Sequence, residues 1–154
     1  MICRRLPARD KPYQRDEVLA AAALHPTIEI VDSRYQDFRS LDRLQVLADN
    51  FSNGALVYGA EVPAAVWQGL DLAHPPIEVT ADGKAFAECS GLRAGTPIDL
   101  LVAAVNHIAN RRGGVPAGTF VTTGTHTGLV FTEPGARIRA DYGRLGAVEV
   151  AFPR

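Results

Sequence analysis

The sequence predicts a mostly β, α+β domain with one long helix. Three observations support this fold class. Short β-branched and apolar segments are separated by glycine and proline, Asp82-Gly83 is a hairpin signal between two such segments, and residues 97–112 have helical periodicity with both end signals. The 154 residues suit one domain of ordinary size, so residues 1–154 are predicted to form a single domain.

The first third of the chain predicts a loop, a short helix and a strand. Residues 6–14 hold two prolines and several charges, which indicates a surface loop. Residues 15–24 have a short helical pattern that His25-Pro26 would stop. The β-branched residues of 28–31 favour a strand.

A second helix and two further strand regions are expected in the middle. Ser40 is predicted to cap a short helix that runs to about Leu47. Residues 55–58 form an apolar strand pattern between Gly54 and Gly59. Residues 77–80 and 84–89 flank the Asp82-Gly83 turn and predict a hairpin.

The clearest element is the helix over 97–112. Thr96 is a suitable N-cap, Pro97 suits the first helical position, and Gly113 suits the end. Its apolar residues lie on one face, which predicts core packing: Ile98, Leu101, Val102, Val105, Ile108 and Ala109. Strands are then expected at 119–123, 136–141 and 147–152.

Composition excludes several classes of partner. Hydrophobic residues make up 47% and charged residues 21% of the chain, and the formal net charge is −1, so no global field favours nucleic acid or an anionic membrane. No apolar run is long enough to cross a bilayer, and no apolar segment follows the first arginines as in a secretory signal. Cys3 and Cys89 are interpreted as reduced thiols, and the chain as cytoplasmic.

Three polar segments could carry chemistry. Glu29 lies among Ile28, Ile30 and Val31, where a carboxylate either faces solvent or binds a cation. Asp32 and Arg34 project to one face of an extended chain and could pair. Residues 49–54 (Asp-Asn-Phe-Ser-Asn-Gly) form either a turn or a set of donors for a ligand carboxylate.

The third segment is 122–128, Thr-Thr-Gly-Thr-His-Thr-Gly, whose hydroxyl and backbone N–H groups could hold an anion. His126 within it could titrate near neutrality, although a solvent-facing loop histidine is the commoner case. The sequence has no P-loop, GxSxG elbow or HExxH motif.

These segments, taken in order, resemble the hydratase and decarboxylase branch of the fumarylacetoacetate hydrolase superfamily. The landmarks that match are Glu29-Ile-Val-Asp-Ser-Arg34, Ala48-Asp-Asn-Phe-Ser-Asn-Gly54, Gly95-Thr-Pro97, Val115-Pro-Ala-Gly118, Thr123-Gly-Thr125, Pro134-Gly135, Ala140-Asp-Tyr-Gly143 and Leu145-Gly146. The resemblance implies a mixed β-roll and a divalent cation, magnesium or manganese. It also implies a small 2-keto or 2-hydroxydienoic acid substrate, whose enolate the cation would stabilise as a Lewis acid, and a homo-oligomer.

The resemblance also implies roles for individual residues. Glu29 matches a metal-binding carboxylate. Ser52, Asp32 and Arg34 are the catalytic candidates, and the substrate-binding candidates are Asn50, Ser52, Thr123, Gly124 and Thr125. The implied activity is 2-keto-4-pentenoate hydratase-like, with a 4-oxalocrotonate decarboxylase-like activity as the alternative.

One departure from the family pattern concerns the metal ligands. Family members carry a Glu-x-Glu pair that also binds the cation, and this sequence contains no Glu-x-Glu. We therefore expect a truncated C-terminal domain that lacks two ligands. Another chain could supply them, or the chain could be a non-catalytic oligomerising or anion-binding module that retains the fold.

Overall fold

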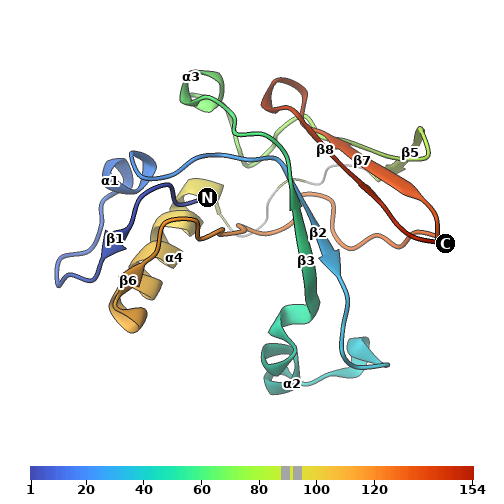
Figure 1. The fold of residues 1–154 in the computed structure, drawn as a ribbon, viewed down its shortest axis with the longest axis horizontal. Helices are drawn as coiled ribbons and strands as arrows, with labels where there is room; N and C mark the ends of the chain where they lie inside the picture. Colours follow the sequence, from blue (N-terminus) through green and yellow to red (C-terminus); the bar gives the residue numbers. More distant parts are fainter. Residues whose placement is uncertain (88–90, 92–94) are drawn as a thin grey trace.

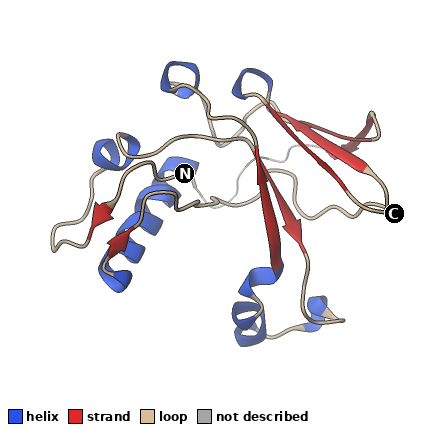
Figure 2. Ribbon diagram, in the orientation of Figure 1, coloured by secondary structure: helices blue, strands red, loops and turns tan. Residues whose placement is uncertain are grey.

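The computed structural model describes residues 1–154 except 88–90 and 92–94. It contains three small antiparallel sheets, and the elements are spread along an elongated body (Figures 1 and 2). The strands are β1 (Leu6–Pro7), β2 (Thr27–Val31), β3 (Asn53–Tyr58), β4 (Glu78–Ala81), β5 (Lys84–Ala87), β6 (Gly114–Val115), β7 (Arg137–Asp141) and β8 (Ala147–Ala151). The helices are α1 (Arg15–Leu19), η1 (Phe38–Ser40), α2 (Arg43–Ala48), η2 (Asn50–Ser52), α3 (Ala64–Trp67), α4 (Pro97–Arg112) and η3 (Gly143–Leu145).

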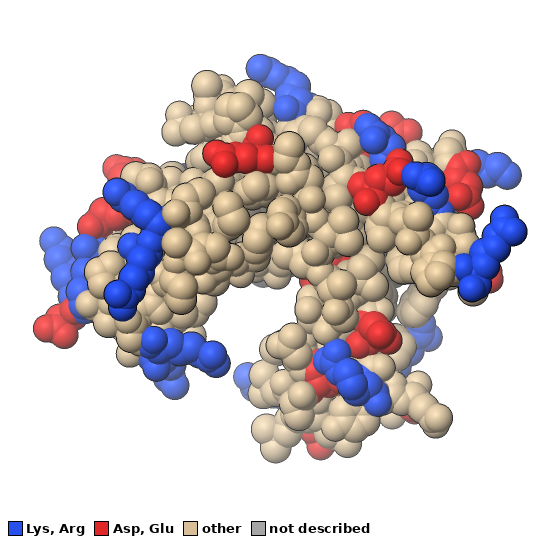
Figure 3. Space-filling view, viewed as in Figure 1, with Lys and Arg blue, Asp and Glu red and all other residues tan. Residues whose placement is uncertain are grey.

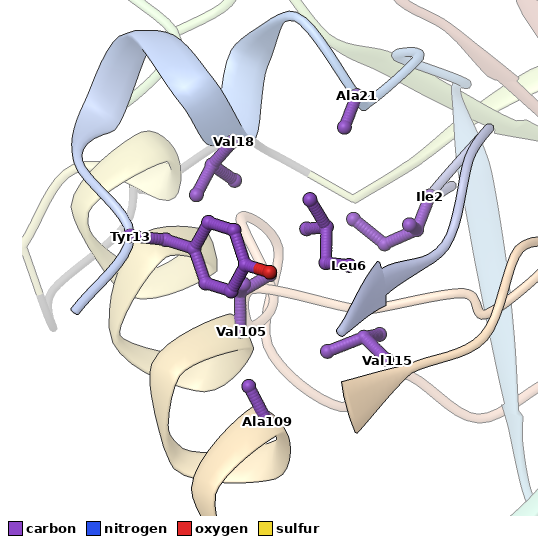
Figure 4. Close-up of a cluster of buried hydrophobic side chains, with 8 residues drawn as sticks. All are labelled: Ile2, Leu6, Tyr13, Val18, Ala21, Val105, Ala109 and Val115. Atoms are coloured by element: carbon purple, nitrogen blue, oxygen red, sulfur yellow. The ribbon is translucent and has the colours of Figure 1, made fainter. Parts of the chain in front are cut away.

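The helix α4 has the predicted ends. The Thr96 hydroxyl accepts from the Asp99 backbone N–H, Pro97 opens the helix, and Gly113 closes it with a left-handed φ of 71°. Val105 and Ala109 are buried in a core with residues of α1, β1 and β6 (Figure 4). The predicted apolar stripe is therefore confirmed as core packing.

The N-terminal segment is more structured than its prolines suggest. Leu6 and Tyr13 are buried in this same core, and Leu6–Pro7 pairs with Gly114–Val115 as β1 and β6. The prediction of a simple surface loop over 6–14 was therefore wrong at these positions. The helix α1 is also shorter than the predicted 15–24, since it ends at Leu19.

The second core lies in the four-stranded sheet, whose order is β5-β4-β7-β8. The turn at Asp82 and Gly83 has left-handed backbone angles at both residues, as a tight hairpin of this sequence requires. Val79, Ile138 and Val148 are buried on its inner face. The strands predicted at 77–80, 136–141 and 147–152 are confirmed to within a residue or two. The Cys89 end of the predicted strand lies outside the described residues.

The strands β2 and β3 form a separate antiparallel arm that projects from the body, with α2 at its far end (Figure 1). We use the word arm for residues 27–58. Asp42, not Ser40, caps α2: its carboxylate accepts from the Gln45 backbone N–H, and the Gln45 side chain accepts from the Asp42 N–H. The Ser40 hydroxyl instead donates to the Asp37 carbonyl.

The prediction of a strand at 119–123 was also wrong. These residues run as irregular chain. Phe120 instead packs its ring against Tyr58, with centroids 4.4 Å apart, and against His25. None of the helices in the described ranges has the length and apolarity that crossing a bilayer requires.

Candidate functional site

A cavity of about 1010 Å³ lies between the arm and the body. Its wall includes β2 and a few further residues of the arm, among them Phe38 and Phe51. The start of α4 and the irregular chain over 120–134 also line it. Seen from one side, the molecule is hollowed between the arm and the region of α4, and few charged side chains line the visible surface of this hollow (Figure 3). The volume is that of a site for a small organic ligand.

Glu29 reaches this cavity from β2. It is exposed and its Oε1 accepts a 2.6 Å hydrogen bond from Asn53 Nδ2 on β3. Asp32 and Ser33 follow on the same strand end and also line the cavity. The predicted strand thus brings Glu29 and Asp32 to one wall.

A glycine allows the two strands of the arm to come close at this wall. The register shifts between Ile30 and Val31, because Ile30 pairs with Ala55 and Val31 pairs with Asn53, which leaves Gly54 as the extra residue of a β-bulge. A Cβ on Gly54 would lie 2.7 Å from the Cβ of Asp32. The close approach of Asp32 therefore requires a glycine at position 54.

Asp49 contacts the cavity-lining residue Ser33 and was not singled out by the sequence patterns. Its side chain has no exposed surface, yet it is a carboxylate. Oδ2 accepts from the hydroxyls of Ser33 (2.7 Å) and Ser52 (2.9 Å), and Oδ1 accepts from the backbone N–H (3.0 Å) and Nε (2.6 Å) of Arg34. These donors, the Ser33 hydroxyl first, lower the pKa of Asp49 to about 2.

Arg34 therefore pairs with Asp49 and not, as predicted, with the Asp32 carboxylate. Its Nη1 donates to the backbone carbonyls of Asp32 (3.2 Å) and Asn53 (2.9 Å), and its Nη2 donates to the carbonyl of Asp49. The side chains of 32 and 34 share a face of extended chain only if the strand continues, but β2 ends at Val31. The only hint in the sequence was the inclusion of Asp49 in the polar segment 49–54.

The backbone of η2 is strained. Asn50, Phe51 and Ser52 have φ values of 52°, 55° and 58°, three successive non-glycine residues in the left-handed region. Each such residue costs about 1–2 kcal/mol relative to ordinary helical angles. The turn faces Phe51 toward the cavity, with 66% of the residue exposed. Strain of this kind is concentrated at functional sites.

The predicted substrate-binding residues divide into two groups. Thr123, Gly124 and Thr125 line the cavity, and the Thr125 hydroxyl accepts from the Gly128 backbone N–H at 3.0 Å. Ser52 is buried and does not line the cavity; its hydroxyl donates to Asp49, and Asn50 is an exposed residue of η2. The structure thus brings Glu29 and the 123–125 turn into the lining of one cavity, whereas Ser52 contacts Asp49.

His126 also lines the cavity, and its Nε2 lies 3.2 Å from the Leu72 carbonyl. This contact connects the 122–128 segment to the chain after α3. A solvent-facing histidine was the commoner expectation for this position, whereas the ring is partly covered.

The described residues do not by themselves complete a metal site. No three histidine, cysteine, aspartate or glutamate side chains among them are grouped so as to hold an ion. Glu29 offers one carboxylate, and a hard divalent cation takes about six or more oxygen ligands. The cation that the resemblance implies therefore does not fit the described residues alone.

Comparison with known proteins gives a consistent result from sequence and from structure. No protein-family model matches the chain. It is 32% identical over 138 residues to a 4-oxalocrotonate decarboxylase of Pseudomonas putida, a match that covers 89% of this chain and 51% of the relative. A second 4-oxalocrotonate decarboxylase, from a Pseudomonas species, is 34% identical over 136 residues, covering 86% and 50%.

Solved structures agree. A 4-oxalocrotonate decarboxylase from Pseudomonas putida G7, complexed with magnesium and adipate, superposes with a TM-score of 0.77 at 30% identity, over 98% of this chain and 57% of that one. The chain is similar in sequence and fold to about half of 4-oxalocrotonate decarboxylase.

The same decarboxylase has also been solved complexed with calcium and acetate, and that structure matches with a TM-score of 0.74 at 29% identity. The predicted fold class is therefore confirmed. Among the two activities implied by the resemblance, these relatives favour the decarboxylase over the hydratase. The chain spans about half the length of the curated relatives it matches.

Proposed function

We propose that this chain forms part of the site of a 4-oxalocrotonate decarboxylase-type protein of the fumarylacetoacetate hydrolase superfamily. The observation that carries the proposal is the cavity bounded by Glu29 and the Thr123–Thr125 turn, in a chain that aligns over 98% of its length with the decarboxylase bound to magnesium and adipate. The substrate class is a small 2-keto dicarboxylic acid.

The cavity suits such an acid in two ways. Its wall is mainly apolar, which fits an unsaturated carbon chain. The hydroxyls and backbone N–H groups of 122–128 provide donors for a carboxylate, and such donors favour an anion. Glu29, hydrogen-bonded to Asn53, is the group that we assign to a divalent cation. The remaining ligands of that cation would come from outside the described residues.

A choice of ligand separates this proposal from the hydratase reading. Adipate has two carboxylates at the ends of a six-carbon chain, and hexanoate has the same length with one. We expect adipate to perturb the backbone amide resonances of 122–128 in a titration followed by NMR, with an affinity at least several-fold higher than that of hexanoate. Equal responses to the two acids would count against a dicarboxylate site.

A second candidate function is a binding module without turnover. It is favoured by one observation, the lack of a three-residue metal cluster in the described parts of the chain. Assays with 4-oxalocrotonate and with 2-hydroxypenta-2,4-dienoate, each with magnesium or manganese, compare the possibilities. We expect neither acid to be turned over by the isolated chain. Turnover of the dienoate would support the hydratase, and turnover of 4-oxalocrotonate would show that the ligand set is complete.

Homo-oligomerisation stays a prediction. The arm exposes Leu44, Leu47 and Phe51, which suits a chain that associates. Sedimentation velocity at several concentrations tests it, and a single monomeric species throughout would contradict it.

A further inference from the structure

A series of hydrogen bonds links the Asp49 carboxylate to Glu29 through Arg34, the backbone of Asn53 and the Asn53 side chain. Asp49 binds Arg34 at Nε, the Arg34 fork reaches the Asn53 carbonyl through Nη1, and Asn53 Nδ2 binds Glu29 Oε1. The distances along it are 2.6, 2.9 and 2.6 Å. The 2.9 Å link has the ordinary N–H···O length, and the two links to carboxylates are slightly shorter.

Asp49 differs from the other acidic residues of the described chain in being buried. Asp49 and Ser52 are the two buried polar residues in the described part of the chain, and they contact each other. A buried carboxylate is tolerated only when its oxygens are paired. Both oxygens of Asp49 accept hydrogen bonds, from Ser33 and Arg34 just beyond β2 and from Ser52 of η2.

The Arg34 side chain can connect the fixed Asp49 carboxylate to Asn53. Its planar guanidinium offers donors in fixed directions, so that one side chain can bind Asp49 and the Asn53 carbonyl together. A lysine would supply one mobile ammonium and could not keep both contacts. The hydrogen bond from Asp32 N–H to the Ser52 carbonyl, 2.8 Å long, adds a second connection between the two segments.

If Asp49 had only a structural role, its effect would be confined to the turn formed by residues 50–52. Asp49 would then hold the left-handed residues 50–52 in place and stabilise the arm, with no effect on the cavity wall. The chain of contacts continues instead to Asn53, whose side chain faces across the arm to Glu29.

We propose that Asp49 is a positioning residue that acts through Arg34 and Asn53 to fix the Glu29 carboxylate at the cavity wall. The inference rests on the proposed function only for the role of Glu29 as a cation ligand. The network itself requires neither a cation nor a substrate.

The side-chain amide of Asn53 reports on this network directly. In ¹⁵N NMR spectra of the intact chain, we expect one Asn53 carboxamide proton to be shifted downfield and to exchange slowly, because it donates to a carboxylate. Glu29→Ala identifies the signal by removing it. In Arg34→Lys we expect its exchange to be at least ten-fold faster, while the amides of Ile138 and Val148 in the four-stranded sheet keep their shifts.

The matched control is Arg39→Lys. Arg39 lies in the same arm but stacks over Phe131, 5.1 Å from the ring centre, away from the network. We expect the Asn53 signal to be unchanged. A folded Arg34→Lys variant with wild-type Asn53 exchange would overturn the proposal, as would an equal loss in Arg39→Lys.

A second variant decides the matter if Arg34→Lys does not fold. Ser33→Ala removes one of the two hydroxyl donors to Asp49 and leaves Arg34 intact. We expect about three-fold faster exchange at Asn53; a lower melting temperature with unchanged Asn53 exchange would show a structural role alone. Since no cation or substrate is present, failure of the proposed function leaves these results unaffected.

Discussion

Asn53 and Glu29 are joined across the arm by a 2.6 Å hydrogen bond, although neither is the backbone partner of the other. Glu29 pairs with Leu56 and Asn53 with Val31, so the contact runs diagonally over the bulge at Gly54. This diagonal contact uses one of the four lone-pair positions of the Glu29 carboxylate and leaves the others available to a ligand.

The isolated chain is expected to bind Mg²⁺ or Mn²⁺ weakly. Since no three potential ligand side chains are grouped in the described residues, the dissociation constant should be on the order of 1 mM or weaker. Isothermal titration calorimetry measures it. Glu29→Ala should abolish the residual binding, whereas Glu149→Ala, which removes an acid of β8 paired with Arg137, should not. Micromolar binding by the wild-type chain would show that its ligand set is complete.

Local signals explain which elements were predictable. Thr96, Pro97 and Gly113 act within a few residues of the helix ends that they define, and α4 has the predicted limits. Asp82-Gly83 acts within its own turn in the same way. These features need no knowledge of the rest of the chain, because the capping and turn geometry is set locally.

The errors have a different origin. The β-branched and aromatic residues at 119–123 favour a strand, but a strand also needs a partner with free hydrogen-bonding groups, and in the structure Phe120 packs on Tyr58. Leu6 and Tyr13 looked like loop residues and are buried because α4, about 90 residues further on, covers them. Contacts over such separations leave no periodic signal in a short segment.

In the candidate site, too, residues in local motifs were predictable and long-range pairs were not. Glu29 and the 123–125 turn were recognisable because they belong to short ordered landmarks, and both line the cavity. The Arg34–Asp49 pair joins residues 15 apart through a β-bulge and a left-handed turn. Neither irregularity follows from propensity, so the pair could not be predicted, and Arg34 was assigned to the nearer acid, Asp32.

The N-terminal core depends on Ile2. This residue has no exposed surface and packs with Leu6, Val18 and Val115. Ile2→Ala should lower the free energy of unfolding by about 3 kcal/mol, since it removes buried methyl groups and leaves a cavity. Leu44→Ala is the matched control, because Leu44 is 74% exposed and its truncation should change stability by less than about 0.5 kcal/mol. Urea unfolding followed by circular dichroism gives both values, and similar losses would contradict this assignment of the core.

The bulge at Gly54 should not accept a side chain. In Gly54→Ala the new Cβ would meet the Asp32 Cβ at 2.7 Å, and the backbone of the bulge would have to shift, at a cost of about 1–3 kcal/mol. Gly118→Ala is the comparison: its Cβ has no heavy atom within 4 Å, so that only the left-handed φ of 82° opposes it. We expect hydrogen exchange at the Asp32 amide to accelerate in Gly54→Ala alone. Unchanged exchange would show that the two strands separate without strain.

Acid should weaken the arm through Asp49. The folded-state pKa of Asp49 is lowered to about 2, below the roughly 3.9 expected of an unfolded aspartate, because the Ser33 hydroxyl and the other donors favour the ionised form. A carboxylate with a depressed pKa binds fewer protons in the folded state, so its contribution is complete above about pH 4 and is lost as the pH falls toward 2. Glu17, whose pKa is lowered to about 2 chiefly by its hydrogen bond from Arg9, titrates over the same range. Stability will therefore still fall with pH to some extent when Asp49 is replaced.

Urea midpoints measured between pH 5 and pH 2.5 test this expectation. Asp49→Asn should flatten the fall in stability over that range, and the variant should be less stable than the wild type at pH 5, where the wild-type carboxylate is fully ionised. Asp10→Asn, which alters an exposed acid in the loop before α1, should keep the wild-type slope. If the Asp49→Asn curve is parallel to the wild-type curve down to pH 2.5, the carboxylate is not held in its ionised form by Ser33, Ser52 and Arg34.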